Sequence, residues 1–238
     1  MRRKTGRRSA LLLLVILTSA GGALAAALKR EPAFYSAAES ETASVEIASQ
    51  SSRLMTRVQD LLNDVGTKPK WGATFSANEL NCFLHEYARE VNERLGGKFH
   101  TPRVHIDGDR VRIGVRSGHG FASGVLWIEL RAWLVASEPN CLAVEIASIR
   151  LGMIPVTEQS VLDRISEVVW QSNVEVTWYR HQGKPVGIFK FFADDSRRLS
   201  KQISAVQISD GQLTIAGRSS VENPLAPAGV GPNWGVGE

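Results

Sequence analysis

The chain has few of the residues on which catalytic and metal sites depend. Its 238 residues include two cysteines and five histidines, too few for a disulfide-dense scaffold or a four-thiolate zinc site. Neither a P-loop nor a G-x-S-x-G elbow occurs. His85 and Glu86 begin like the zinc motif H-E-x-x-H, but Arg89 stands where the second histidine is required. The sequence therefore predicts no catalytic residue, no metal site and no cofactor.

Basic charge is scarce beyond the first residues. The net charge is +4, and removing the five basic residues among the first eight positions leaves −1 for the rest of the chain. Those five are Arg2, Arg3, Lys4, Arg7 and Arg8. A nucleic-acid-binding domain carries its basic charge on the folded surface, where it replaces counterions on phosphate. The near-neutral body excludes nucleic acid as a predicted partner.

Residues 10–28 are nineteen consecutive residues without a charge. As a helix they would be about 28 Å long, close to the roughly 30 Å thickness of the hydrocarbon layer. The positive-inside rule keeps the basic tract (1–9) in the cytoplasm and places the domain outside. We therefore predict a single-pass anchor in the membrane. The alternative is a signal peptide cleaved after 23–25 or 25–27, which would secrete the domain.

Three helices are predicted after a polar stalk at 29–52. Leu54, Val58 and Leu61 begin an apolar stripe over 53–65. Ser76 and Glu79 form the capping box of a second helix, which ends at glycines 96–97. A third helix follows Thr157.

Alternating apolar residues predict strands at 104–106, 111–115, 121–136, 141–153, 174–181, 185–192, 202–209 and 212–218. Asp107-Gly108, Gln182-Gly183 and Asp210-Gly211 are turn pairs, which favour antiparallel hairpins. The predicted fold class is α+β: a long curved antiparallel sheet of about eight strands with two or three helices packed on one face. The domain spans 53–220, and the proline- and glycine-rich residues 221–238 are predicted to be a disordered tail.

Two residue pairs leave alternatives open. Cys82 and Cys141 would both lie outside the cytoplasm, where a disulfide persists, so a bridge between them is possible. Glu129 and Glu145 are candidate cross-strand neighbours, and paired carboxylates can do acid–base chemistry. Because Arg131 and Arg150 are expected nearby, a surface ion pair is the favoured interpretation. No catalytic role is assigned to these carboxylates.

Tryptophans are the most suggestive candidates for binding. Trp127 and Trp133 lie opposite the predicted core face of their strand, and Trp178 lies in another strand. They predict a contact surface for an apolar ligand such as lipid, or for an envelope protein. The simpler interpretation is that helices or strands cover them. Two alternative functions remain: an assembly scaffold that acts through a sheet edge or the helix at 53–65, and a hydrolase or metal enzyme using histidines 85, 105, 119 or 181.

Segments 75–84, 102–114, 149–155 and 175–181 resemble an uncharacterised family of single-span exported bacterial proteins. The resemblance covers roughly residues 29–220. More distantly, the chain is similar to YpmS-like envelope proteins, which share the anchor, the (F/L)-(S/T)-x-x-E-(L/I)-N helix, long strands and G-x-(I/L)-P before a helix. These motifs are structural, so the resemblance implies export and fold and assigns no catalytic residue.

Overall fold

The computed structural model describes residues 25–40, 47–88, 93, 99–118, 123–171, 174–191 and 199–221. The predicted basic tract, most of the predicted anchor and the predicted tail lie outside these residues. The described helices are α2 (Ala33–Ser40), α3 (Ile47–Thr67), α4 (Ala77–Glu86) and α6 (Glu158–Gln171). The strands are β1 (Lys70–Ser76), β2 (Phe99–Asp107), β3 (Arg110–Ser117), β4 (Gly124–Leu134), β5 (Cys141–Leu151), β6 (Ile154–Pro155), β7 (Glu175–His181), β8 (Lys184–Lys190), β9 (Leu199–Ser209) and β10 (Gln212–Val221).

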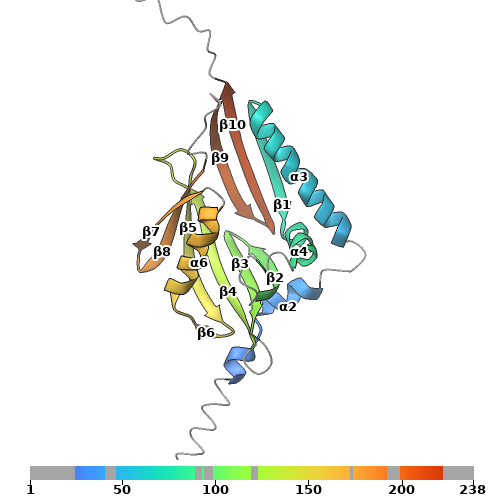
Figure 1. Cartoon of the computed structure of the whole chain (residues 1–238), viewed down its shortest axis with the longest axis vertical. Coiled ribbons are helices and arrows are strands. Elements are labelled where there is room, and N and C mark those ends of the chain that lie inside the picture. Colours follow the sequence, from blue (N-terminus) through green and yellow to red (C-terminus); the bar gives the residue numbers. More distant parts are fainter. Residues whose placement is uncertain are drawn as a thin grey trace, which may run out of the picture.

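The predicted α+β class with a large antiparallel sheet is confirmed, but the described strands form two sheets instead of one (Figure 1). The large sheet has seven strands, in the order β2-β3-β4-β5-β8-β7 with β6 paired to β5. The small sheet has the order β1-β10-β9. The sequence did not predict β1, because this strand is short and contains Gly72. Its partner is also distant: Thr74 pairs with Thr214, 140 residues later.

Helix α4 begins as the sequence predicts. The Ser76 hydroxyl accepts a hydrogen bond from the Glu79 N–H at 3.1 Å, and the Glu79 carboxylate accepts one from the Ser76 N–H at 2.9 Å. Arg57 of α3 donates to the same carboxylate at 2.9 Å. Burial raises the pKa of Glu79, but these hydrogen bonds and the arginine charge outweigh it and hold the pKa below its ordinary value. The capping box thus also ties α3 to the start of α4.

Helices cover both faces of the large sheet, so the prediction that they pack on one face is wrong. On one face, Phe34 and Tyr35 of α2 form a buried cluster with Val125 of β4. On the other face, Leu162 of α6 packs against Ile146 of β5. The part of β4 near Val125 is therefore apolar on both faces, because a helix lies against each of them there.

Part of the segment expected to be a stalk is packed into the domain. Tyr35 is 1% exposed. Its ring lies over Gly114 of β3, where a Cβ atom would come within 2.8 Å of it. The Tyr35 hydroxyl donates to the carbonyl of Thr101 at 2.6 Å. The sequence did not predict this contact, because two adjacent aromatic residues in an Ala/Ser-rich segment produce no helical stripe.

The chain enters the domain at the turn between β5 and β6. Residues 25–29 are helical, and the Met153 N–H donates to the carbonyl of Ala27 at 3.0 Å. A Cβ atom at Gly152 would lie 2.5 Å from the carbonyl oxygens of Ala27 and Leu28, and Gly152 has a φ of +58°. Glycine is required here for both reasons. Among the described helices, none is long and apolar enough to cross a membrane.

Two of the three predicted tight turns form as expected. At 182–183 and 210–211 both central residues have positive φ, as a type I′ turn requires. The third turn is displaced by one residue, because Asp107 pairs with Arg110. Gly108, with a φ of 55°, is therefore the first central residue and not the second.

Candidate functional site

The structure does not bring the three predicted tryptophans together. Trp127 and Trp133 share the face of β4 that meets α2. The Trp127 indole donates to the carbonyl of Gly152 at 2.9 Å, and Trp133 is 42% exposed. Trp178 lies on the opposite face of the sheet and donates to the Ser166 hydroxyl of α6 at 2.8 Å. No single surface therefore contains all three indoles.

The small sheet has one polar and one apolar face. The hydroxyls of Thr74 and Thr214 meet at 2.9 Å on the polar face. Side chains alternate along a strand, so the neighbouring residues point to the other side. Two cross-strand rows make up that apolar side: Phe75, Leu213 and Ile208, then Ala73, Ile215 and Val206. The apolar side chains of β9 and β10 in these rows are only half-buried.

One end of this apolar face is closed by Trp71, which lies across Gly217. A Cβ atom at Gly217 would come within 2.1 Å of the indole. The indole N–H donates to the Ser219 hydroxyl at 3.0 Å, and that hydroxyl donates to the carbonyl of Val65 at 2.7 Å. Helix α3 is thereby attached to the small sheet at this end of its apolar face.

The face of the large sheet that meets α6 is apolar as well. Leu162 and Ile165 of α6 cover Ile146 and its neighbours, and β9 contacts β4. Two further cross-strand rows lie on this face: Trp178, Gly187, Val144 and Ala132, then Val176, Phe189, Leu142 and Leu134.

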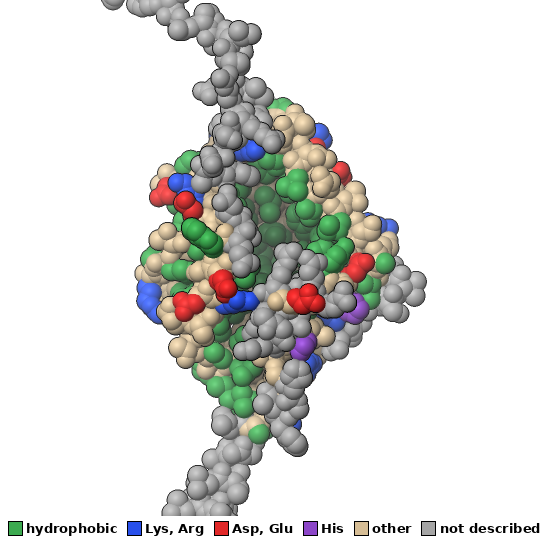
Figure 2. Space-filling model, in the orientation of Figure 1, with side chains coloured by type: hydrophobic (Ala, Val, Ile, Leu, Met, Phe, Trp, Pro, Cys, Tyr) green, Lys and Arg blue, Asp and Glu red, His purple; other side chains and the backbone are tan. Residues whose placement is uncertain are grey.

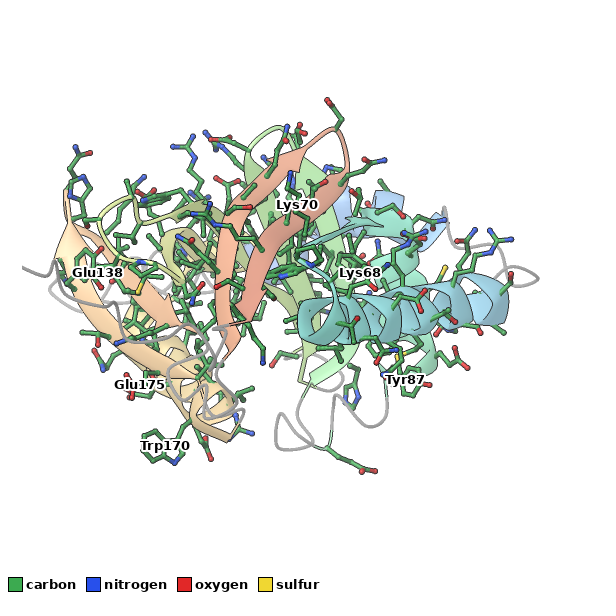
Figure 3. The ribbon with its side chains drawn as sticks, turned by 90° about the horizontal axis from the view of Figure 1, so that it is seen from above. Lys68, Lys70, Tyr87, Glu138, Trp170 and Glu175 are labelled. Atoms are coloured by element: carbon green, nitrogen blue, oxygen red, sulfur yellow. The ribbon has the colours of Figure 1, made fainter. Side chains whose placement is uncertain are left out.

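The two apolar faces border a hollow that we call the apolar trough. It is lined by half-buried aliphatic side chains: Leu130, Leu134, Leu142, Val206, Ile208, Leu213 and Ile215. Figure 2 shows the hollow near the middle of the molecule, with hydrophobic side chains at its bottom. In Figure 3, Tyr87 of α4 and Trp170 of α6 lie on opposite sides of the domain. Trp170 is 80% exposed.

Two asparagine side chains hold the walls of the trough. The Asn81 amide of α4 donates to the carbonyl of Val104 in β2 at 2.8 Å and accepts from its N–H at 2.7 Å. Asn140 donates to the carbonyl of Lys201 at 2.7 Å and accepts from the N–H of Ile203 at 2.8 Å. Each amide makes the pair of backbone hydrogen bonds that a neighbouring strand would otherwise make. These directional hydrogen bonds fix the positions of α4 and β9. The two apolar faces therefore do not have to pack directly against each other to be held in place.

The sequence did not predict the residues that line the trough. It predicted a hairpin over most of β9 and β10, where Val206 and Ile208 alternate with polar residues. That alternation indicates one apolar face. The pattern does not indicate what covers this face. The half-burial of its side chains is therefore known only from the structure. Trp170 was also missed, although it stands next to the apolar stripe of its helix.

An ion-pair cluster occupies the outer face of the large sheet. The Glu129 carboxylate accepts from Arg110 at 2.7 Å and from Arg112 at 2.8 Å. Glu145 accepts from Lys184 at 2.9 Å, and its cross-strand partner is an arginine of β4 instead of Glu129. The two carboxylates therefore form separate ion pairs. Each carboxylate does form an ion pair, but neither pairs with Arg131 or Arg150 as predicted, and Glu129 is buried and not on the surface.

We expect Glu129→Gln to lower the free energy of unfolding by about 2 kcal/mol at pH 7. Burial raises the pKa of Glu129, but the hydrogen bond from Arg112 and the charges of Arg110 and Arg112 outweigh it and lower the pKa. The unfolded carboxyl keeps its ordinary value of about 4.3, so the stabilisation is present above that pH and is lost as the pH falls through the folded value. Urea unfolding at pH 7 and at acid pH measures both effects, with Glu175→Gln on exposed β7 as control. Equal stability of Glu129→Gln and wild type at pH 7 would contradict the assignment.

The cysteines and histidines do not assemble a reactive centre among the described residues. Cys82 and Cys141 are both buried and neither is in a disulfide, so the bridge that the sequence left open does not form. Burial and the nearby carboxylate of Glu138 raise the pKa of the Cys141 thiol, which keeps it protonated. His105 stacks on a phenylalanine of α2, and His119 lies outside the described residues. Within the described part of the chain, no three His, Cys, Asp or Glu side chains are grouped to hold a metal ion.

No protein-family model, curated protein or solved structure matches this chain. The apolar trough is therefore interpreted from its own residues. Its lining is aliphatic and offers contact area without a group that titrates or attacks a substrate.

Proposed function

We propose that this chain is a membrane-anchored protein whose extracytoplasmic domain binds an apolar ligand, such as a lipid, in the apolar trough. The observation that carries the proposal is that each sheet has rows of half-buried aliphatic side chains on one face, and that β9 of the small sheet contacts β4 of the large one. These side chains are only partly covered by neighbouring elements, and an apolar surface that a domain leaves partly accessible is a candidate binding site. A concave apolar lining is also the usual character of a ligand pocket.

The N-terminal segment supports a membrane source for this ligand. Residues 10–28 carry no charge and follow five basic residues. The carbonyl of Ala27 accepts a hydrogen bond from Met153 at 3.0 Å, so the domain begins directly where the apolar segment ends. A retained anchor would hold the trough close to the bilayer surface and to its lipids.

The proposed role is binding without catalysis. Every side chain named in the trough lining is Leu, Ile or Val, and burial of such surface contributes roughly 25 cal/mol per Å². Non-directional contact of this kind suits an acyl chain, which has no hydrogen-bonding groups to satisfy. Trp170 of α6 is exposed, and an indole can contact both an apolar chain and a polar headgroup.

Val206→Trp is expected to fill the trough and displace the ligand. The full chain would be extracted in mild detergent, stripped of lipid, incubated with phosphatidylethanolamine and measured by native mass spectrometry. Gln207→Trp is the matched control, because its side chain points to the polar face of the same strand. We expect a lipid adduct on wild type and on Gln207→Trp, and at least a tenfold loss of the adduct on Val206→Trp.

Two outcomes would overturn the proposal. One is the absence of any adduct on wild type with phosphatidylethanolamine or with a total lipid extract. The other is equal loss of the adduct in both tryptophan variants. Circular dichroism and thermal unfolding of each variant separate loss of binding from loss of the fold.

A further inference from the structure

A second concave surface lies between α3 and β1. This polar groove has a volume of about 660 Å³ and is lined from α3 by Asp60, Leu61 and Asp64 and from β1 by Gly72 and Thr74. Its volume is in the range of roughly 300–1,000 Å³ that is usual for ligand sites. Because β1 is an edge strand of the small sheet, one wall of the groove is a row of backbone groups.

The direction of those backbone groups follows from the hydrogen bonds at the two ends of β1. The carbonyl of Pro69 accepts from the N–H of Ser219 at 3.1 Å, and the N–H of Ala77 donates to the carbonyl of Gly211 at 2.8 Å. Odd-numbered residues therefore bond to β10. In an antiparallel strand the alternate residues point the other way. The outward N–H and C=O groups belong to Lys70, Gly72, Thr74 and Ser76.

One end of this edge is already occupied. Arg57 donates to the carbonyl of Thr74 at 2.7 Å, and the N–H of Ser76 donates to Glu79 at 2.9 Å. These contacts protect the edge as natural proteins commonly do. Within the described residues, no hydrogen bond engages the outward N–H and C=O of Gly72. The unprotected part of the edge therefore faces the groove.

The opposite wall of the groove is acidic. Asp60 and Asp64 are four residues apart and share one face of α3. Lys68 pairs with Asp64 at 2.8 Å, and Arg57 pairs with Glu79 at 2.9 Å. Among the described residues Asp60 has no ion-pair partner. The wall is left with negative charge beside the open backbone.

We infer that this edge binds an extended peptide segment of another protein as a fourth strand of the small sheet. The main chain of the segment would bond to the outward groups of Lys70 and Gly72, which is how strand addition provides affinity. A lysine or arginine of the segment would face Asp60 and provide selectivity. This site is separate from the apolar trough and would serve an envelope assembly role.

Binding of two labelled peptides to the full chain in detergent tests the inference. The first carries the repeat Lys-Val-Thr-Val and the second the repeat Glu-Val-Thr-Val, each eight residues long and labelled with fluorescein. We expect saturable fluorescence anisotropy with the basic peptide and at least fivefold weaker binding of the acidic one. Hydrogen exchange at Gly72 should slow when the basic peptide binds.

Two variants locate the peptide. Gly72→Pro removes the outward N–H of this residue and leaves all hydrogen bonds between β1 and β10 in place. It should therefore abolish binding of the peptide. A Cβ there would lie only 3.1 Å from the carbonyl of Ile215, and its folding is checked by circular dichroism. Asp60→Lys on the surface of α3 should weaken binding of the basic peptide at least fivefold. Glu175→Lys makes the same charge change on β7, far from Lys70 in Figure 3, and should leave binding unchanged.

The inference is overturned if the basic peptide does not bind saturably. It is also overturned if Asp60→Lys and Glu175→Lys weaken binding equally, because attraction would then come from overall charge. Neither result bears on lipid adducts in the apolar trough.

Discussion

Replacing Asn81 by leucine is expected to lower the free energy of unfolding by about 3 kcal/mol. The residue is 4% exposed, and its amide satisfies both the N–H and the carbonyl of Val104 at 2.7 and 2.8 Å. Leucine is similar in size but leaves both backbone groups buried without a partner. The loss should therefore exceed that of a typical surface substitution several times.

Urea unfolding of Asn81→Leu and Asn63→Leu measures this effect. Asn63 is exposed on α3, so its replacement should change the free energy of unfolding by less than about 0.5 kcal/mol. Asn81→Leu should also reduce lipid adducts, because Asn81 holds α4 against β2 beside the trough. Similar stabilities of the two variants would show that the Asn81 amide does not join these elements.

Gly217→Ala is the second substitution with a large expected effect, a loss of about 3 kcal/mol. A Cβ atom at this position would lie 2.1 Å from the buried Trp71 ring. The ring cannot move without breaking its 3.0 Å hydrogen bond to Ser219. One added methyl group should therefore disturb the contact between α3 and the small sheet.

A double-mutant cycle with Trp71→Leu tests that cause. The smaller side chain removes the contact with the indole, so Gly217→Ala should cost less in the Trp71→Leu background, although the carbonyl oxygen of Gln202 still lies 2.5 Å from the added Cβ. Gly66→Ala is the control, since no atom lies within 4 Å of a Cβ there and alanine favours the helix. Equal costs of Gly217→Ala in both backgrounds would exclude a clash with the indole.

Local features of the fold were predictable because their causes lie within a few residues. Examples are the Ser76–Glu79 capping box, the turns at 182–183 and 210–211, and the long strands β4 and β5. Each depends on backbone conformation or on alternation along one segment. The turn at Gly108 was misplaced by one residue, because the Asp-Gly pair alone does not specify register.

The candidate sites were less predictable. The sequence indicates Trp127 and Trp178 as candidate binding residues because they are large and apolar. In the structure each is half-buried, and its indole donates a hydrogen bond inside the protein. The trough and the open edge of β1 arise where distant segments meet, and single residues in them look ordinary. Val206 would be a core residue if a helix covered it.

The sequence alone determined where α4 begins, where two of the hairpins turn and which face of each long strand is apolar, since adjacent residues control these properties. The division into two sheets, the pairing of β1 with β10 and the opening between the sheets depended on contacts across up to 140 positions. Many alternative pairings satisfy the same alternation pattern. Only simultaneous packing of all the segments selects one of them, and the surfaces proposed for lipid and peptide follow from that selection.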